Sequence, residues 1–365
     1  MTVGVAVIGC GTISHEYLRN LTSFPDLRVL ACADLDVARA REVAERYGVP
    51  VSGPPELALG VDGVEIVVNL TIPAAHVDVA LAAVAAGRHV YNEKPLALDP
   101  AGGARLMAAA AQAGVRVGGA PDTFLGAGLQ TALRLLAEGA IGQPLTVRTV
   151  MQGNGPDRWH SSPEFLFQTG GGPMFDMGPY YLTVLTAAFG PVARVAATAR
   201  TARAERVIGS GPRAGTRFAV EVPTYVSALL DFAAGPAATT TFSFDAPNAD
   251  LVFEVAGSES TLRVPNPNYF GGSSALLRAG EREWTEVPAA GITAGRGLGV
   301  LEMARAIRAG VPHRASGERA LHVVEVMTAA IESAKSGMFV DIVSTVESVD
   351  PLPADWDPFT RTLPG

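Results

Sequence analysis

The first residues of the chain that could do chemistry form a glycine-rich turn. Residues 9–14, Gly-Cys-Gly-Thr-Ile-Ser, follow an apolar run and open a stretch of helical spacing. They match the pattern G-x-G-x-x-G/A, with small Ser14 in the last place. Gly9 would allow a tight turn, Gly11 would let the backbone approach a pyrophosphate, and the following helix would offer free N–H groups to phosphates. The pattern predicts a dinucleotide site with contacts from Gly9, Gly11, Thr12 and Ile13; the alternative is a purely structural turn.

An acidic residue ends the second strand-like run. Asp34 lies 20 residues beyond Ser14, where a carboxylate accepts hydrogen bonds from ribose hydroxyls. The same charge repels the 2′-phosphate of NADP. Leu35 follows directly, and Arg39 is expected to point along its helix. We therefore expect NAD as the cofactor, with NADP less favoured, and Asp34 and Leu35 among its contacts; the alternative for Asp34 is a helix cap.

Strand-like and helix-like runs alternate over the first third of the chain. Short apolar runs rich in β-branched residues predict strands at 3–8, 28–34, 65–70, 89–92 and 115–117. Stretches with helical spacing separate them. This alternation predicts βαβ units and a parallel sheet, and thus an N-terminal Rossmann domain over residues 1–121.

The pattern changes beyond that point. Helical spacing at 125–138 and 173–189 is followed by several runs rich in Thr, Val and Phe, with no helices between them. Such clustering predicts a large, mostly antiparallel sheet with its helices on one face. We expect an α+β substrate and oligomerisation domain over residues 122–345.

Three shorter stretches stand apart from this pattern. Residues 122–124 are expected to start the second domain and to line a cleft. Residues 203–217 are rich in Gly, Arg and Ala and predict a mobile loop. Residues 346–365 predict a C-terminal tail, because the chain from Asp350 onward carries four prolines and no periodicity.

Composition excludes several classes of function. Hydrophobic residues make up 48% and charged residues 18% of the chain, which excludes wholesale disorder. The formal charge is −8 without a long basic tract, so a nucleic-acid partner is not expected. No apolar run reaches the roughly 20 residues of a membrane-spanning helix, and no signal peptide is apparent. The two cysteines, Cys10 and Cys32, form no disulfide framework or zinc site. We expect a cytoplasmic protein with a small-molecule partner and no metal.

Lys94 and Pro95 end the fourth predicted strand. Ligands of an open parallel sheet lie beyond the carboxyl ends of its strands. Lys94 is therefore expected where a bound nicotinamide would lie. From composition alone, a surface lysine before a turn is the better interpretation.

Several motifs together resemble one enzyme family. The glycine turn is joined by Thr71-Ile72-Pro73 with His76, by Gly87-Arg88-His89-Val90, and by Glu93-Lys94-Pro95. Downstream, GGGPMFDMGPY at 170–180 resembles a second signature, G-G-G-x-x-x-D-x-G-x-H. Over most of its length the chain thus resembles the glucose–fructose oxidoreductase / inositol dehydrogenase (Gfo/Idh/MocA) family.

The resemblance implies a Rossmann domain followed by an α/β domain whose open sheet often forms an oligomer interface. We therefore expect a homo-oligomer, either a dimer or a tetramer, formed through the C-terminal sheet. The resemblance also implies NAD or NADP, and substrates that are sugars, polyols or their derivatives. Its implied cofactor contacts are Thr71, Pro73, His76, Glu93 and Lys94. For His76 a role at the start of a helix is equally open.

Three residues are implied to be catalytic and to bind substrate. Lys94 would hold the reacting oxygen, and Asp176 would support the site. Tyr180 stands where most of the family has His, and a phenol can donate and accept a proton; the alternative is that Tyr180 only packs and Lys94 works alone. Asp176 and Tyr180 share one face if the segment is helical. Pro179 then requires the helix to begin near Asp176 or to kink there.

Trp159 and His160 lie in a polar loop shortly before the glycine run. In the family that the chain resembles, such loops often lie over the substrate, and sugars stack on aromatic faces. We expect both residues to contact substrate; the alternative is an ordinary surface loop.

Together these inferences predict an NAD-dependent dehydrogenase. It would transfer hydride between nicotinamide and a secondary hydroxyl or keto carbon of a sugar, cyclitol or glycoside. One alternative is a glycoside-cleaving enzyme that keeps NAD as a resident redox cofactor, marked by net hydrolysis without NADH accumulation. The other is a catalytically silent sensor that binds NAD and a sugar, which any measurable turnover would exclude.

Overall fold

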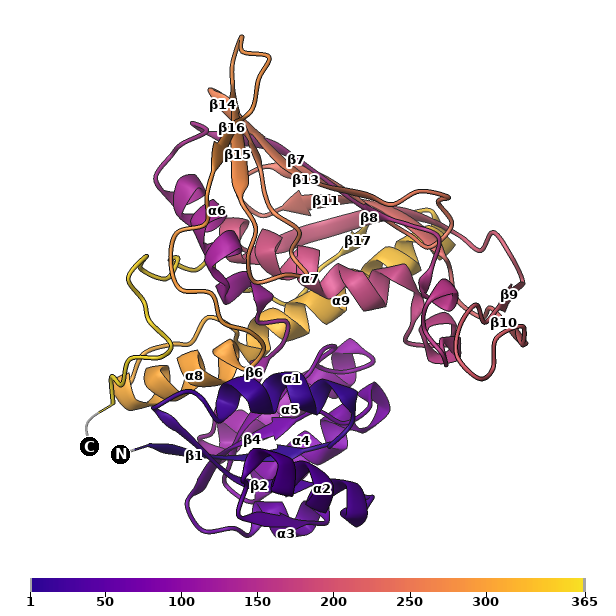
Figure 1. Ribbon diagram of the computed structural model, residues 1–365. Coiled ribbons are helices and arrows are strands. Elements are labelled where there is room, and N and C mark those ends of the chain that lie inside the picture. The colour runs from indigo at the N-terminus through magenta and orange to yellow at the C-terminus, as the bar shows by residue number, and fades with distance from the viewer. Residues whose placement is uncertain (1, 364–365) are drawn as a thin grey trace. The chain divides into compact units, whose positions relative to one another are not determined.

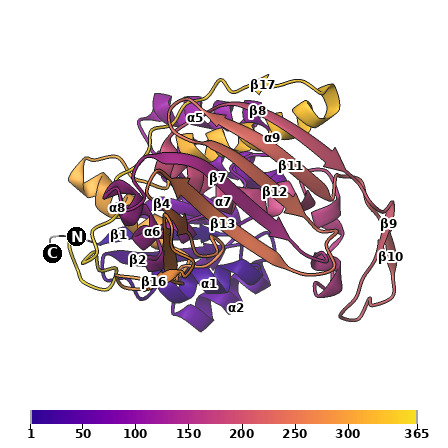
Figure 2. The ribbon, with the colours of Figure 1, turned by 90° about the horizontal axis from the view of Figure 1, so that it is seen from above.

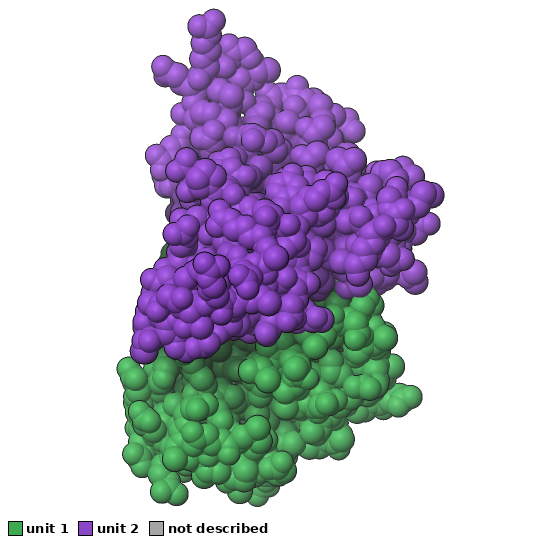
Figure 3. Space-filling view, turned by 90° about the vertical axis from the view of Figure 1, so that its right-hand side faces the viewer, with its two compact units in different colours: residues 1–130, 290–324, 352–365 green, residues 131–289, 325–351 purple. Residues whose placement is uncertain are grey.

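The computed structural model describes residues 2–363 and folds as two compact units, each built from separate stretches of chain. Unit 1 comprises the chain up to Gln130, Ala290–Val324 and the chain from Leu352 onward. Unit 2 comprises Thr131–Ala289 and Glu325–Pro351 (Figure 3). This division differs from the expected boundaries at 121 and 345, because late segments of the chain complete the first unit.

Unit 1 is built on a six-stranded parallel sheet in the order β3-β2-β1-β4-β5-β6 (Figure 1). The strands are β1 (Val3–Ile8), β2 (Leu27–Ala33), β3 (Val51–Gly53), β4 (Val64–Asn69), β5 (His89–Asn92) and β6 (Val117–Gly119). The predicted Rossmann fold is confirmed. Sequence analysis missed β3, because three residues are too few to show a strand period.

Helices connect these strands and lie on both faces of the sheet. They are α1 (Thr12–Leu21), α2 (Val37–Tyr47), α3 (Pro55–Leu59), α4 (His76–Ala85), α5 (Pro100–Ala113) and, from later in the chain, α8 (Leu298–Ala309). Helix α1 contacts α2 and α8, whereas α4 contacts α5. Local chemistry sets the helix ends: the Asp36 and Asp99 side chains accept backbone N–H groups at the starts of α2 and α5, and Gly48 and Gly114 end them in the left-handed conformation.

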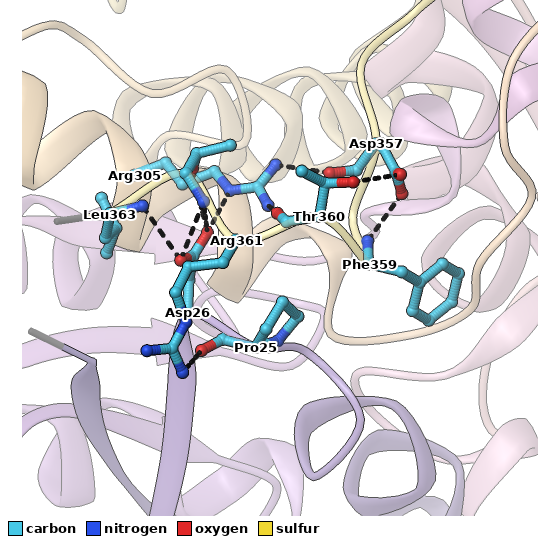
Figure 4. Close-up of polar contacts among 9 residues, drawn as sticks. Pro25, Asp26, Arg305, Asp357, Phe359, Thr360, Arg361 and Leu363 are labelled. Atoms are coloured by element: carbon cyan, nitrogen blue, oxygen red, sulfur yellow. Dashed lines mark hydrogen bonds and ion pairs between the residues drawn. The ribbon is translucent and has the colours of Figure 1, made fainter. Parts of the chain in front are cut away.

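The predicted C-terminal tail is fastened to unit 1. Asp26, fully buried just before β2, accepts the backbone N–H of Leu363 at 3.0 Å and pairs with Arg305 of α8 at 2.9 Å (Figure 4). Arg305 also donates to the carbonyl of Thr360 at 2.8 Å, and Arg361 donates to that of Pro25 at 2.9 Å. A segment without regular secondary structure is therefore held by ion pairs and hydrogen bonds.

Unit 2 is built on a nine-stranded sheet in the order β16-β15-β14-β13-β7-β12-β11-β8-β17 (Figure 2). Its strands are β7 (Pro144–Gln152), β8 (Val192–Arg200), β11 (Tyr225–Phe232), β12 (Ala237–Ser243), β13 (Asp250–Gly257), β14 (Ser260–Arg263), β15 (Ser274–Arg278), β16 (Thr285–Val287) and β17 (Val340–Asp341). Neighbouring strands are antiparallel except for the parallel pair β12 and β7. The predicted mostly antiparallel sheet is confirmed.

Helix α7 (Gly172–Phe189) packs on β11 and β12 of this sheet. Along β11, Val226, Ala228, Leu230 and Phe232 are buried, whereas Leu229 between them is half-exposed. Two further helices, α6 (Ala127–Ala137) and α9 (Gly317–Ser336), each contribute residues to both units. None of the helices within residues 2–363 is long and apolar enough to span a lipid bilayer.

The stretch 203–217, predicted as a mobile loop, contains ordered structure. Strands β9 (Glu205–Val207) and β10 (Arg217–Ala219) form a two-stranded sheet. Arg206 of β9 is only 3% exposed, and its guanidinium donates to Asp157 at 2.9 Å and to the Phe244 carbonyl at 2.8 Å. The loop prediction was wrong here because a surface-like composition concealed a buried ion pair.

Candidate functional site

The glycine turn has the backbone that the sequence predicted. Gly9 has φ of 101°, and a Cβ there would lie 2.6 Å from the carbonyl of Leu70, so only glycine fits. A Cβ on Gly11 would meet nothing within 4 Å, which leaves open space over the turn. Gly11 is also the N-cap of α1, and no side chain caps that end. Free N–H groups at a helix N-terminus are suited to phosphate.

A pocket of about 420 Å³ adjoins this turn. Its walls are Cys10, Gly11, Thr12, His15, Arg39, Glu42 and Val43. Of the predicted cofactor contacts, Gly11 and Thr12 line it, whereas Gly9 shapes the turn and Ile13 lies half-buried on α1. Sequence reasoning missed His15 and Arg39, although His15 lies one helical turn after Thr12.

Asp34 closes the turn from the end of β2. Its carboxylate accepts the backbone N–H of Cys10 at 2.7 Å and that of Asp36 at 2.9 Å. Arg39 does not simply follow its helix, because its guanidinium lies 3.8 Å from the Asp34 carboxylate. Leu35 is exposed. The carboxylate is thus held beside the turn where the sequence pattern requires it.

The loop after β4 is linked to the loop after β5 through His76. Thr71 donates its hydroxyl to the Asn69 side chain at 2.7 Å. His76 begins α4 and is 1% exposed, with Nδ1 at 2.6 Å from the Pro95 carbonyl and Nε2 at 3.0 Å from the Thr71 carbonyl. Pro73 opens the exposed turn before α4. A single imidazole therefore connects two loops that were predicted to contact the cofactor.

Glu93, Lys94 and Pro95, called the Lys94 turn below, follow β5. Glu93 is buried, and its Oε2 accepts the backbone N–H of Lys94 at 2.7 Å. Its Oε1 accepts the Tyr17 hydroxyl at 2.8 Å and lies 3.6 Å from Arg296 Nη1. Lys94 itself is half-buried. One oxygen of the Glu93 carboxylate thus faces Tyr17 and Arg296, and the other holds the backbone N–H of Lys94.

These segments follow neighbouring strands of one parallel sheet. The glycine turn follows β1, Asp34 follows β2, Thr71 follows β4 and the Lys94 turn follows β5, in the spatial order β2-β1-β4-β5. The carboxyl ends of parallel strands meet at one edge of the sheet. This is the edge at which doubly wound sheets bind their ligands.

Asp122 and Arg296 interact with the buried Glu93 behind the Lys94 turn; sequence analysis missed Arg296 and expected Asp122 in a different place. Asp122 was expected at a cleft, yet it is fully buried in unit 1, where it accepts the backbone N–H groups of Gly297 at 2.8 Å and Gly299 at 3.1 Å. Burial raises the pKa of Asp122 to about 6, although the Arg296 charge opposes this shift. The sequence does distinguish the Lys94 turn in one way, because Lys94 is one of only two lysines in the chain, the other being Lys335.

In unit 2, Asp176 and Tyr180 lie one turn apart on α7. The helix begins at Gly172 and continues through Pro179, so it does not begin near Asp176. Tyr180 is 4% exposed and Asp176 is half-buried. A buried phenol and a carboxylate therefore share one face of a continuous helix.

Trp159 and Phe165 bound a short stretch of unit 2, called the aromatic segment below. Trp159 is 68% exposed, and its ring lies 5.7 Å from that of His160, which lies 5.5 Å from that of Phe165. His160 Nδ1 accepts the backbone N–H of Ser162 at 3.0 Å. The aromatic rings contact one another and leave the Trp159 face open to solvent. Among residues 2–363, no group of His, Cys, Asp or Glu has the arrangement of a metal site.

Curated relatives align with part of the chain. The inositol 2-dehydrogenase of Burkholderia cenocepacia (strain HI2424) is 32% identical over 151 residues, which cover 40% of this chain and 44% of the relative. The inositol 2-dehydrogenase of Streptomyces avermitilis is 38% identical over 148 residues, or 39% and 43% of the two chains. These alignments span less than half the length of either relative.

Solved structures share the whole fold. Levoglucosan dehydrogenase in complex with NADH and L-sorbose superposes with a TM-score of 0.80 at 22% identity, covering 94% of this chain and all of that one. The aldose-aldose oxidoreductase of Caulobacter crescentus, in complex with glycerol, has the same TM-score, identity and coverage. At this identity the likeness establishes the architecture.

Family models match both parts of the chain. Residues 3–119 match the oxidoreductase family with an NAD-binding Rossmann fold. Residues 129–263 match the GFO/IDH/MocA C-terminal domain. Together the two matches cover well over half of the chain, and they confirm the resemblance drawn from the sequence motifs. The chain therefore belongs to the Gfo/Idh/MocA family of NAD-binding oxidoreductases.

Proposed function

We propose that this protein is an NAD-dependent dehydrogenase that oxidises a secondary hydroxyl of a sugar, cyclitol or glycoside, or reduces the matching ketone. One observation supports this proposal above the others. A bare helix N-terminus, a ribose-type carboxylate and Lys94 follow neighbouring strands along one edge of a parallel sheet. In space the Asp34 carboxylate comes first, then the helix N-terminus and then Lys94, which is the order of adenosine ribose, pyrophosphate and nicotinamide along an extended dinucleotide.

The residues at this edge fit NAD. The open space above Gly11 leaves room for a pyrophosphate against the backbone, and Asp34 favours a free ribose 2′-hydroxyl over a 2′-phosphate. We propose that Gly9, Gly11 and Thr12 bind the pyrophosphate, that Asp34 and Leu35 bind the adenosine ribose, and that Thr71, Pro73 and Lys94 adjoin the nicotinamide. When bound, NAD supplies the hydride acceptor.

Proton transfer and orientation fall to the chain's own residues. In the oxidation direction a bound NAD would accept hydride from the substrate carbon, and a base of the protein would take the proton of its hydroxyl, which leaves a ketone. We propose that Lys94 holds the reacting oxygen, that Tyr180 takes the proton, and that Asp176 orients the substrate. The half-buried Lys94 and the buried Tyr180 support these roles, since excluding water strengthens electrostatic interactions.

The substrate class is proposed from two observations. The relatives include inositol 2-dehydrogenases, and the structural neighbours include levoglucosan and aldose oxidoreductases. The exposed Trp159 ring, with His160 beside it, offers a flat apolar face of the kind on which sugar rings stack. A polyhydroxylated ring is therefore the proposed substrate.

Assembly and compartment are also proposals. The half-exposed Leu229 and Leu251, on β11 and β13 of the nine-stranded sheet, support a homo-oligomer formed through that sheet. Cys10 and Cys32 are buried free thiols, and a hydrogen bond with Cys10 together with burial raises the pKa of Cys32. Free thiols in the core suit a reducing cytoplasm.

The test is a panel of sugars and cyclitols with NAD or NADP, followed by absorbance of the reduced nicotinamide. We expect turnover on at least one cyclitol or sugar, with higher kcat/KM for NAD. Lys94→Ala should lower kcat at least a hundredfold, on the scale of a lost electrostatic or acid–base group, while NADH affinity by fluorescence changes little.

Lys335→Ala is the matched control, because it removes the only other lysine from the exposed end of α9. Near-normal turnover in Lys94→Ala would exclude Lys94 from the mechanism. Product formation without NADH accumulation would instead indicate a glycoside-cleaving enzyme.

A further inference from the structure

Behind the Lys94 turn, a buried carboxylate connects the lysine backbone to an arginine from a distant part of the chain. Glu93 Oε2 accepts the Lys94 N–H at 2.7 Å, and Oε1 lies 3.6 Å from Arg296 Nη1. The side chains of Arg296 and Glu93 are 18% and 10% exposed. A charge pair this deeply buried interacts far more strongly than an exposed one.

The position of Arg296 is itself set by its neighbours. It lies in the loop that leads into α8, and the Asn20 side chain donates to its carbonyl at 2.9 Å. On its other side, Asp122 holds the backbone N–H groups of Gly297 and Gly299. The backbone of Arg296 is therefore anchored on both sides, so its guanidinium is presented to Glu93 from a fixed base.

Arg296 also provides the positive charge for this group of buried acids. It opposes the raised pKa of Asp122, and it opposes the raised pKa of Tyr17, which burial and then the Glu93 charge cause. Without that cation, Glu93 would be a buried charge balanced only by hydrogen bonds. A buried carboxylate without a cation is free to turn toward water, and that movement would weaken its hold on the Lys94 N–H.

We infer that Arg296 is a positioning residue for Lys94: it holds the Glu93 carboxylate in place through their buried charge pair, and Glu93 in turn fixes the backbone of the Lys94 turn. Arg296 needs no contact with substrate or cofactor for this role. The inference rests on the proposed function only in its effect on turnover. Its structural part concerns the Lys94 backbone alone and can be measured without a substrate.

The lysine content of the chain makes the structural part directly measurable. Because Lys94 and Lys335 are the only lysines, protein labelled with ¹⁵N-lysine gives two backbone amide signals, and Lys335→Arg assigns them. We expect Arg296→Met to accelerate hydrogen exchange of the Lys94 amide at least tenfold and to leave the Lys335 amide unchanged. Arg296→Lys should restore most of the protection.

The matched control is Arg314→Met, which breaks another buried pair of unit 1. Arg314 lies 3.0 Å from Glu302, with exposures of 25% and 4%. We expect this variant to lower the melting temperature while both lysine amides exchange as in the wild type. If Arg296→Met fails to fold, Tyr17→Phe removes the other donor to Glu93 Oε1 and should accelerate Lys94 exchange about threefold.

The turnover arm separates this inference from the proposed function. With an active substrate, Arg296→Met should lower kcat at least tenfold, keep NADH affinity within about twofold, and be partly rescued by Arg296→Lys. Wild-type exchange of the Lys94 amide in Arg296→Met, or equal acceleration in Arg314→Met, would overturn the inference. An inactive wild-type enzyme would instead overturn the proposed function, and the amide measurement would still decide the role of Arg296.

Discussion

The Lys94 turn of unit 1 and the aromatic segment of unit 2 each depend on a buried arginine, but at different distances from their functional side chains. Arg296 pairs with Glu93, the direct neighbour of Lys94. Arg206 pairs with Asp157, which lies before Trp159, and with Asp245. In unit 1 the arginine therefore lies next to the neighbour of Lys94, the proposed catalytic lysine, whereas in unit 2 it fixes the base of a segment whose Trp159 and Phe165 rings are exposed.

This difference indicates that the two segments need to be held with different rigidity. A residue that holds a reacting oxygen must stay within a fraction of an ångström of its position, so its backbone is fastened from inside the unit. A residue that only stacks on a sugar can keep rotational freedom at its tip. Tyr180, although in unit 2, is buried like the Lys94 turn and belongs with the fixed residues.

The largest expected effect is a loss of kcat, and it tests whether Tyr180 is one of the residues that must be held in a fixed position. Tyr180→Phe keeps the ring and removes only the hydroxyl, so kcat should fall by about 10² to 10⁴ with a modest change in KM. Tyr180→His should recover part of the loss. Tyr181→Phe is the matched control, because this neighbour packs against Phe242 and Phe253. Full activity in Tyr180→Phe would assign proton transfer to Lys94 alone.

The second prediction removes the anchor of the aromatic segment. Arg206→Met leaves Asp157 and Asp245 without their cation, and breaking a buried pair of this kind costs about 3–5 kcal/mol. Denaturant unfolding should show that loss, while NADH affinity stays unchanged because the nucleotide edge lies in unit 1. Arg217→Met, from an exposed pair on the same hairpin, should cost under about 1 kcal/mol; equal costs would show that burial does not matter here.

A third prediction concerns a buried pair that holds the tail. Burial alone would raise the pKa of Asp26, but hydrogen bonds from the Leu363 amide, Arg305 and Thr362 outweigh it and lower the pKa below its ordinary value. A lowered pKa stabilises the fold above the unfolded-state value of about 3.9, and this stabilisation is lost as the pH falls through the folded-state value.

The variant Asp26→Asn should therefore cost about 1–3 kcal/mol at pH 7, with kcat unchanged. Urea unfolding midpoints should show the gap between wild type and variant narrowing in acid. Asp231→Asn, from the exposed pair with Arg194, serves as control. A gap that widens as the pH falls would contradict the assigned sign.

The smallest expected effect comes from the exposed end of the aromatic segment. Trp159→Ala removes a stacking face without opening a cavity, so KM should rise about tenfold while kcat and stability change little. Trp284→Ala, which removes the ring beneath Arg263, should leave KM unchanged. A drop in kcat with constant KM would show that Trp159 must also be held in a fixed position. The aromatic segment would then not differ from the Lys94 turn in this respect.

Features set by local chemistry could be predicted from the sequence. The predicted turn at Gly9 is confirmed, and it depends on a few neighbouring residues, as do the left-handed helix ends at Gly48 and Gly114 and the helix cap at Asp99. The same holds for the helix that carries Asp176 and Tyr180. Motif spacing gives these positions because the backbone conformation there is determined within a few residues.

Features set by contacts between distant residues could not be predicted. Arg206, Arg296 and Asp122 form their contacts with residues far away in the chain, and no local pattern distinguishes them from surface polar residues. Composition gave a wrong prediction for Arg206, because a stretch rich in Gly and Arg is typical of a surface loop and Arg206 is buried. The roles assigned to Lys94, Asp176 and Tyr180 remain predictions until the variants are measured.

The interleaving of the two units has a consequence for synthesis. Asp26 leaves the ribosome long before Arg305, Thr362 and Leu363, which satisfy its carboxylate. Until those residues emerge, the nascent Rossmann sheet carries an acidic side chain without its hydrogen-bond partners. Most of unit 2, by contrast, emerges in one piece as Thr131–Ala289, and only Glu325–Pro351 follows later. We therefore expect a pulse-labelled nascent chain to acquire protease resistance within Thr131–Ala289 before it does so in the Rossmann strands of unit 1.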